Sequence, residues 1–369
     1  MKNILIGILL FLFTSCVQER GNLNCYTLSV DLKNSSLQYS DVFSGAEVIP
    51  LETTDSSLIV YPFEVIEHKG YFYLYDLHLI KAFIFDEKGK FVRQIGNKGQ
   101  GPREYTWLSS ISIDKNRDVI HLIEPVNNYL TYTLDGNFIE QKKYPDDNDY
   151  QCFYPFDNYM AAWSIPSSND SDCIYIFNPE TMEVLNKYYR GPALALSQGF
   201  HYYKDNLYYH ENMGNNVYQV TKDSLKLVYQ WDFGKENFVT SDLDLTFKDE
   251  NKEHEYDLFW KYMKDGTVPY IKVGQAQNDD YNYVCLRYQY KYDKSIFYRK
   301  NDGKYLIWGE EDWGMPTNAL VFTDDYMIVL LKQNNYNNFK PLLSESEREK
   351  LDALSEDDNP CLLKLYFKK

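Results

Sequence analysis

The sequence has few of the features that mark membrane-spanning or nucleic-acid-binding proteins. Its longest apolar run, Ile4–Phe13, has ten residues, whereas a membrane-spanning helix needs about 20. Lysine and arginine number 38 against 54 aspartates and glutamates, which gives a formal charge of −16. Because phosphate binding needs a clustered basic face, this balance argues against a nucleic-acid partner and indicates a solvated, acidic surface.

Motifs for catalysis and metal binding are also missing. There is no Gly-x-Ser-x-Gly elbow, no His-Glu-x-x-His and no phosphate loop, because the run Gly96–Gly101 lacks a Gly-Lys-Ser/Thr ending. With six histidines and no Cys-x-x-Cys, no cofactor or metal site is identified. Asp146–Asp149 lacks the ligand spacing of a calcium loop and is read as a solvated turn.

The cysteines do not form a disulfide framework. Beyond Cys16 there are five, at positions 25, 152, 173, 285 and 361, and an odd number cannot all pair. Cys152 and Cys173 fall in neighbouring expected strands and can bridge. Buried thiols are the expectation for the others.

The first residues have the pattern of an export signal. Lys2 precedes the apolar run, and Ser15-Cys16 ends it. This ending resembles a lipobox, the site where bacterial lipoprotein processing attaches lipid to cysteine; an ordinary signal peptide is the alternative. We expect residues 1–15 to be the signal peptide, 16–44 a lipidated tether with one strand near Tyr26–Leu32, and 45–369 the folded domain. The protein is then membrane-anchored through Cys16 in the cell envelope, on the periplasmic or the cell-surface face.

The rest of the chain predicts an all-β fold. Aromatic residues are 17% of the total, with 35 tyrosines, while alanine is scarce. Alternating segments separated by turns fall into six four-stranded units, and the hairpin glycines Gly89 and Gly136 are 47 residues apart, a spacing typical of propeller blades. The last unit lacks one strand, and Ala46–Leu51 is one strand over. Pairing the two closes a six-bladed β-propeller.

Two helical insertions interrupt the strands. Tyr256, Phe259, Trp260 and Met263 follow the i, i+3, i+4, i+7 spacing of an apolar helix face that packs on the sheets. Ser344 and Glu347 have the spacing of a capping box and predict a short helix through Leu354.

The chain resembles the NHL-like six-bladed β-propeller lipoproteins of Bacteroidales-type bacteria. Four segments carry the resemblance: 48–55 (VIPLETTD), 85–91 (FDEKGKF), 95–105 (IGNKGQGPREY) and 357–366 (DDNPCLLKLY). The family pattern usually has glycine where this chain has Arg103. The resemblance implies a propeller in the cell envelope; it brings no catalytic residues.

In such a ring, the loops between blades share a face with the loops between second and third strands, and we expect a ligand site there. The candidate ligand-binding residues are Lys98, Arg103, Glu104, Tyr105, Trp107, His78, Lys81, Asn128, Trp260 and Trp313. The alternative for residues 96–105 is a purely structural blade joint, in which Glu104 and Tyr105 satisfy backbone groups.

We expect a binding or scaffolding module for a glycan, a peptide or an envelope protein. The alternative is a propeller lyase or hydrolase acting on a glycan or peptide, with a metal held near the central channel by His78, His201 and His210. Another possibility is an envelope structural protein without a small ligand.

Overall fold

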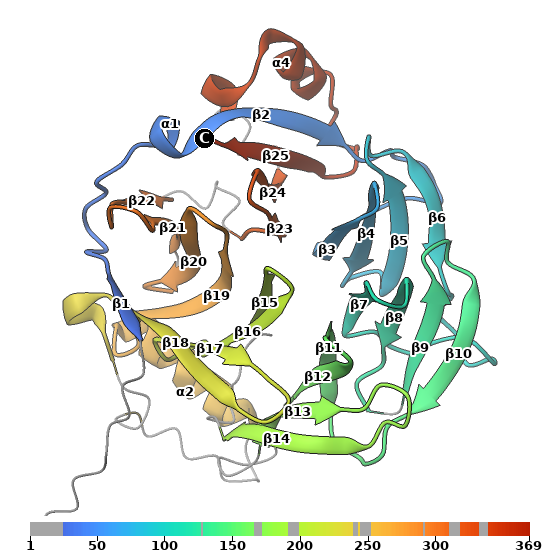
Figure 1. Ribbon diagram of the computed structural model, residues 1–369. Helices are drawn as coiled ribbons and strands as arrows, with labels where there is room; N and C mark the ends of the chain where they lie inside the picture. The colour runs from blue at the N-terminus through green and yellow to red at the C-terminus, as the bar shows by residue number, and fades with distance from the viewer. Residues whose placement is uncertain are drawn as a thin grey trace, which may run out of the picture.

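The computed structural model is a ring of six β-sheets (Figure 1). It describes residues 25–126, 128–165, 172–190, 199–238, 243, 252–290, 292–309, 318–331 and 339–369. Each sheet contains one four-stranded antiparallel blade with its first strand nearest the central axis. The predicted six-bladed propeller is therefore confirmed.

The first three blades follow one another directly along the chain. Blade 1 contains β3 (Pro62–His68), β4 (Tyr71–Asp76), β5 (Lys81–Asp86) and β6 (Phe91–Ile95); blade 2 contains β7 (Ser110–Asp114), β8 (Val119–Ile123), β9 (Asn128–Thr133) and β10 (Phe138–Lys143); blade 3 contains β11 (Tyr150–Phe156), β12 (Tyr159–Ser164), β13 (Asp172–Phe177) and β14 (Val184–Arg190).

The other three blades complete the ring. Blade 4 contains β15 (Phe200–Tyr203), β16 (Asn206–His210), β17 (Asn216–Val220) and β18 (Leu225–Asp232); blade 5 contains β19 (Tyr270–Gln277), β20 (Tyr281–Tyr288), β21 (Tyr292–Arg299) and β22 (Tyr305–Trp308); blade 6 contains β23 (Val321–Phe322), β24 (Tyr326–Leu331), β25 (Cys361–Phe367) and β2 (Phe43–Pro50).

The burial of each strand explains its residue pattern. Middle strands such as β5 are covered on both sides by neighbouring blades, so Ala82–Phe85 are all buried. The outer strand β10 alternates between half-buried and exposed side chains because one of its sides faces water. Between blades 1 and 2, for example, Tyr73, Tyr75, Ile111 and Ile113 belong to one apolar cluster. The core thus lies between blades.

Strand β2 closes the ring as expected. It pairs antiparallel with β25, from Ala46 opposite Leu365 to Pro50 opposite Cys361. The seam is reinforced by the buried Asn359, whose amide oxygen accepts from Ile59 N–H (2.8 Å) and whose amide nitrogen donates to the carbonyls of Glu52 (2.9 Å) and Ser57 (2.7 Å).

Three of the four segments that carry the family resemblance meet at this seam. Glu52, from segment 48–55, donates its backbone N–H to the carbonyl of Gly89 (2.8 Å) and accepts the Phe91 N–H on its carboxylate (2.8 Å). Asn359, from segment 357–366, bonds to Glu52 as described above. These segments therefore have a structural role in ring closure.

The chain joins the propeller before the expected domain boundary at residue 45. Strand β1 (Tyr26–Ser29) adds to blade 4 as a fifth strand, parallel to β18, with Tyr26 opposite Tyr229 and Ser29 opposite Asp232. Val30 and Leu32 then bury their side chains, and the short helix α1 (Tyr39–Val42) leads into β2. Part of the segment assigned to a tether is thus packed structure.

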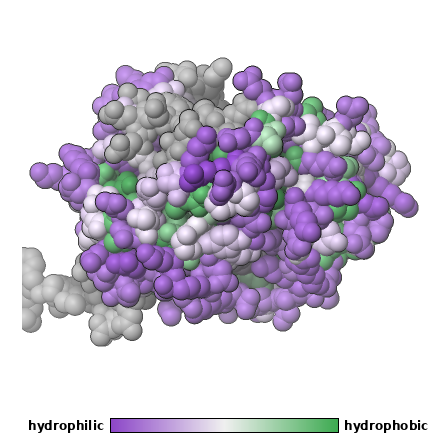
Figure 2. Space-filling model, turned by 90° about the horizontal axis from the view of Figure 1, so that it is seen from above, coloured by the Kyte–Doolittle hydropathy of each residue, from purple (hydrophilic) through white to green (hydrophobic). Residues whose placement is uncertain are grey.

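Both predicted helical insertions are present. Helix α2 (Lys252–Asp265) buries Phe259 and Met263. Helix α4 (Glu345–Asp352) is capped by Ser344, which accepts the Glu347 N–H at 3.3 Å, and it ends two residues before the predicted end at Leu354. Short 3₁₀ turns occur at Gly234–Glu236 and Lys340–Leu342. The rim on the α4 side is mostly hydrophilic (Figure 2).

The five cysteines of the described residues are thiols. Cys152 lies in β11 and Cys173 in β13, with β12 between them, and no disulfide joins them. Burial raises the pKa of the Cys361 thiol to about 12 and that of the Cys152 thiol well above its usual value. These thiols therefore stay protonated and pack as apolar groups.

The propeller has two different faces. Loops between blades contact the loops between second and third strands: the Leu77 N–H donates to the Tyr61 carbonyl (3.1 Å) and the Thr106 N–H to the Glu124 carboxylate (2.7 Å). We call this side the joint face. The opposite side carries the short turns between first and second and between third and fourth strands, and we call it the turn face.

Candidate functional site

Exposed large apolar side chains gather on the joint face. Most of the exposed large hydrophobic residues in the described ranges belong to its loops or strand ends: Leu58, Val60, Tyr61, Phe63, Trp107, Val126, Ile165 and Tyr290. Such residues are costly to leave in water when they are grouped, and grouping marks interaction sites. The joint face is therefore the candidate functional surface.

The aromatic residues at blades 1 and 2 form the best-defined part of this surface. The rings of Tyr61 and His78 are 5.7 Å apart, and Phe63 packs edge-on against Tyr75 at 6.3 Å. The Tyr75 hydroxyl donates to the carbonyl of Leu108, the residue after Trp107. We call Tyr61, Phe63, His78 and Trp107 the aromatic patch.

A buried carboxylate holds the aromatic patch in place. Asp76, at the end of β4, is fully buried and accepts the N–H groups of Val60 (2.6 Å), Tyr61 (2.8 Å) and Leu79 (2.8 Å). It thereby fastens the loop before β3 to the turn that carries His78. A carboxylate with three N–H donors is a strong anchor, because hydrogen bonds to a charged group are the stronger kind. Tyr61 is thus presented to solvent on a fixed backbone.

The loop 96–107 is closed by its own hydrogen bonds. The Tyr105 N–H donates to the Asn97 carbonyl (3.1 Å), and the Gly99 N–H donates to the Tyr105 carbonyl (2.9 Å). The Glu104 carboxylate accepts the Gly101 N–H at 2.7 Å. Tyr105 is fully buried, and burial raises the pKa of its hydroxyl. Glu104 and Tyr105 therefore act as the structural alternative expects, within the joint.

Among the predicted ligand residues of the loop, Lys98, Arg103 and Trp107 are exposed. Arg103 has φ of +71°, a conformation that favours glycine, and its guanidinium lies 5.3 Å from the ring centre of Phe138. The glycine that is usual in the family pattern adopts this backbone conformation without strain. Arginine is strained here, but its side chain gains a contact with blade 2. Trp107 is half exposed on the same joint face.

The other predicted ligand residues are spread around the ring. Lys81 is half-buried in β5, and Asn128 begins β9, where its side chain accepts from Gln141. Trp260 of α2 packs against Tyr290 at 5.7 Å, on the blade 4 and 5 side of the molecule (Figure 1). Trp313 and the lipid-attachment residue Cys16 lie outside the described residues.

The three histidines considered for a metal do not come together. His201 and His210 are neighbours in blade 4, with ring centres 6.3 Å apart, whereas His78 belongs to blade 1. Burial lowers the pKa of His201 to about 3 and that of His210 well below its ordinary value. Within the described residues, histidine, cysteine and acidic side chains form no cluster of three or more that can hold a metal ion.

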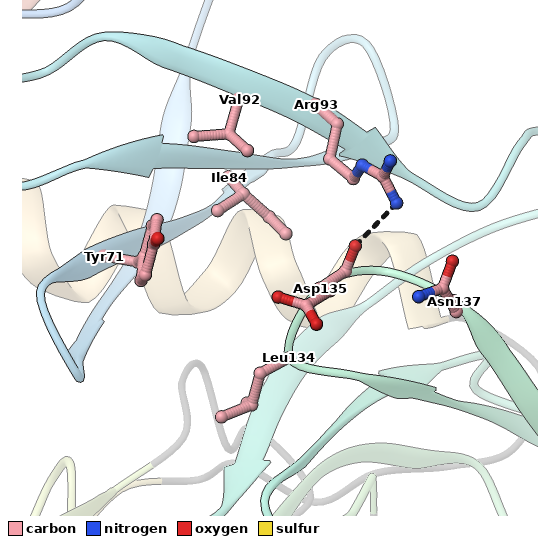
Figure 3. A pocket seen from close by; sticks show the side chains of 7 residues that line it. All are labelled: Tyr71, Ile84, Val92, Arg93, Leu134, Asp135 and Asn137. Carbon is pink, nitrogen blue, oxygen red and sulfur yellow. Dashed lines mark hydrogen bonds between the residues drawn. The ribbon is translucent and has the colours of Figure 1, made fainter.

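Sequence reasoning missed Tyr61, Phe63 and their anchor Asp76. It also missed a hollow of about 310 Å³ between the outer parts of blades 1 and 2, lined by Tyr71, Ile84, Val92, Arg93, Leu134, Asp135 and Asn137 (Figure 3). There the Arg93 guanidinium donates to the Asp135 carbonyl at 2.7 Å and is already engaged. The hollow is shallow and we give it no role.

No helix in the described part of the chain is long and apolar enough to cross a membrane. No curated protein sequence shows significant similarity to the chain.

Solved structures with similar folds include two from Bacteroides. A Bacteroides fragilis protein described as exported aligns with a TM-score of 0.74 at 18% identity, over 94% of this chain and 100% of that chain. A duf4221 family member from Bacteroides vulgatus aligns with a TM-score of 0.55 at 11% identity, over 89% of this chain and 97% of that chain. At these identities the likeness concerns the fold. The model of the DUF4934 family, described as a domain of unknown function, matches residues 25–366, and the chain belongs to that family.

Proposed function

We propose that the protein is a lipid-anchored propeller of the cell envelope that binds a glycan or a peptide through the aromatic patch. The observation that carries the proposal is the exposure of Tyr61, Phe63 and Trp107 on one face, on a backbone fixed by Asp76. Rigid aromatic side chains provide a large contact area at a small cost in conformational entropy. Export and lipidation at Cys16 belong to the proposal, as does the kinship with NHL-like lipoproteins. The likeness to an exported Bacteroides protein is consistent with them.

The geometry does not favour the alternative of a metal-dependent lyase or hydrolase. That activity required His78, His201 and His210 at one site, and they belong to blades on different sides of the ring. A binding module is therefore the function that the geometry supports best.

We expect the double variant Tyr61→Ala/Trp107→Ala to lose affinity for the glycan or peptide that an array screen selects. Each lost aromatic contact is expected to cost about 1 kcal/mol of binding free energy. Two such losses weaken binding at least about tenfold, because a tenfold change in Kd is about 1.4 kcal/mol. Titration calorimetry on the folded chain provides the measurement.

The matched control is Tyr71→Ala. Tyr71 and Tyr61 are each 41% exposed, but Tyr71 begins β4 at the turn-face end. Equal loss of affinity in the control and the double variant would contradict a site on the aromatic patch. A screen in which no glycan or peptide binds would contradict the function itself.

The path of β1 determines how an anchored molecule faces the membrane. Strand β18 ends at Asp232 on the joint face, and β1 runs parallel to it, so Tyr26 lies toward the turn face. Residues 17–25 connect Cys16 to Tyr26, and a chain of this length reaches at most about 35 Å. A lipid on Cys16 would hold the turn face toward the membrane and leave the aromatic patch facing outward.

The orientation can be measured on the lipidated protein in vesicles. We expect a fluorophore on Asp223→Cys, in the turn before β18, to be quenched by spin-labelled lipid headgroups more than one on Asn97→Cys of the joint face. A Cys16→Ala variant, which should not float with vesicles, tests the anchor separately. Stronger quenching at position 97 would reverse the orientation without affecting the anchor or the binding result.

A further inference from the structure

Three basic side chains are buried together where blades 4 and 5 pack against each other, and we call their immediate surroundings the crevice. They are His201 of β15, His210 of β16 and Lys272 of β19, with exposed fractions of 8%, 2% and 0%. The two blades are fastened at this level, because the Lys272 N–H donates to the Asn212 carbonyl (2.9 Å) and the Asn212 amide donates back to the Lys272 carbonyl (3.0 Å). Lysine is almost never fully buried unless it is paired.

Most nitrogen atoms of the three side chains have no hydrogen-bond partner in the described structure. These atoms are Lys272 Nζ, Nδ1 of His201 and both ring nitrogens of His210, whose ring makes only a weak contact with the backbone of Gly199. The Gln277 amide nitrogen lies 3.4 Å from His201 Nε2, which places the ring proton of His201 on the unpartnered Nδ1. The crevice therefore has donors without acceptors, and a buried donor without a partner is costly.

The nearest acidic group is already engaged. The Glu211 carboxylate accepts from the Tyr218 hydroxyl (3.1 Å) and more weakly from the Asn216 N–H (3.4 Å). Burial lowers the pKa of Lys272 to about 7, and Glu211 only partly offsets this. The described residues thus provide no counter-ion in hydrogen-bonding contact with the Lys272 ammonium.

We propose that this crevice binds a monovalent anion of carboxylate size. Lys272 Nζ is the ionic partner, and the N–H groups of His201 and His210 are hydrogen-bond donors to its oxygens. A carboxylate accepts on two atoms and carries one charge, which matches one ammonium with flanking imidazoles. A metal cation would be repelled by Lys272. None of these residues belongs to the aromatic patch, so the site goes beyond the function proposed above.

Anion binding is expected to tighten as the pH falls from 8 to 6. Lys272 and the two imidazoles take up protons more easily beside a negative charge. The other charged groups near them are Glu211, which favours the protonated lysine, and Lys300, which opposes protonation of His201. Burial lowers the pKa of Lys300 to about 8, so Lys300 also gains charge as the pH falls over this range.

Thermal unfolding of the purified chain in sodium formate, at constant ionic strength, tests the site. We expect Tm to rise with formate concentration and then saturate, with half-saturation at a lower concentration at pH 6 than at pH 8. Lys272→Met is expected to lose this dependence and to fold, because it removes a buried charge. Lys364→Met is the matched control, because that lysine has its own acidic partner, Glu67, at 3.4 Å.

Three outcomes would overturn the proposal. A formate effect of equal size in Lys272→Met, or a rise with sulfate that matches that of formate in every variant, would indicate a general salt effect. Crystals grown in sodium bromide provide an independent readout. We expect an anomalous peak about 3.3 Å from Lys272 Nζ, and an ordinary water at that place would show that the crevice is only hydrated.

Discussion

Gly89→Ala is expected to destabilise the propeller by about 3–5 kcal/mol, because it combines backbone strain with a collision inside the ring seam. Gly89 has φ of +81°, and a Cβ there would lie 2.0 Å from the Pro50 carbonyl oxygen and 3.3 Å from Ile49 Cγ2. Since the Glu52 N–H donates to the Gly89 carbonyl, the turn cannot move away without breaking the seam. Thermal or denaturant unfolding measures the loss, with Tm expected to fall on the order of 5–10 °C.

Gly266→Ala separates the two causes. Gly266 has nearly the same backbone conformation, with φ of +83°, but a Cβ there would meet nothing within 4 Å. Its alanine variant should lose only the strain, about 1 kcal/mol. If the two variants were equally destabilised, the close approach of Gly89 to β2 would contribute nothing to the loss of stability.

The fold could be predicted because its signals are local. The hairpin glycines Gly89 and Gly136 were read as turns, and both have positive φ between strands. Alternation along outer strands and continuous apolar runs along middle strands reflect contacts with the neighbouring blades. Ring closure followed from counting strands, because an unpaired edge must find a partner.

The candidate site was less predictable because its signals are non-local. The exposure of Tyr61 depends on Asp76, a residue fifteen positions away that holds the backbone from the end of another strand. In the opposite direction, Tyr105 looked available to a ligand, yet its loop folds over it and buries the ring completely. In neither case does the residue type indicate which side chain faces water.

The buried polar residues were the hardest to foresee. Lys272 lies within a strand. Alternation along a strand predicts which side of the sheet a side chain is on, but not whether that side is covered. The bulge between Lys272 and Gly274 and the packing of blade 4 decide that the side chain is enclosed. Such a position is visible only once two blades are assembled.

Stability is expected to fall steeply as the pH drops from 6.5 to about 3. His121, His201 and His210 are all buried, and burial lowers the pKa of His121 and of His201 to about 3 and that of His210 well below its usual value. The unfolded chain binds protons on these residues below pH 6.5, whereas the folded chain does not. Each histidine therefore lowers the free energy of unfolding by about 1.4 kcal/mol for every pH unit in this window. The three together lower it by about 4 kcal/mol per pH unit.

His121→Asn isolates one of these contributions. The His121 ring contacts the Thr131 hydroxyl through Nδ1 at 3.0 Å, and its Nε2 has no partner in the described structure. Asparagine can keep a polar atom near Thr131 but does not titrate. Unfolding free energies measured by denaturant from pH 7 to pH 4 should therefore depend on pH with a slope smaller by one proton.

These unfolding free energies are best measured in buffers without small carboxylates, because an anion beside His201 and His210 would offset their protonation. His78→Asn is the matched control, because it makes the same substitution at an exposed histidine. An unchanged slope in His121→Asn would mean that water or a proton reaches blade 2 in the folded state, and the acid sensitivity would then belong to blade 4 alone.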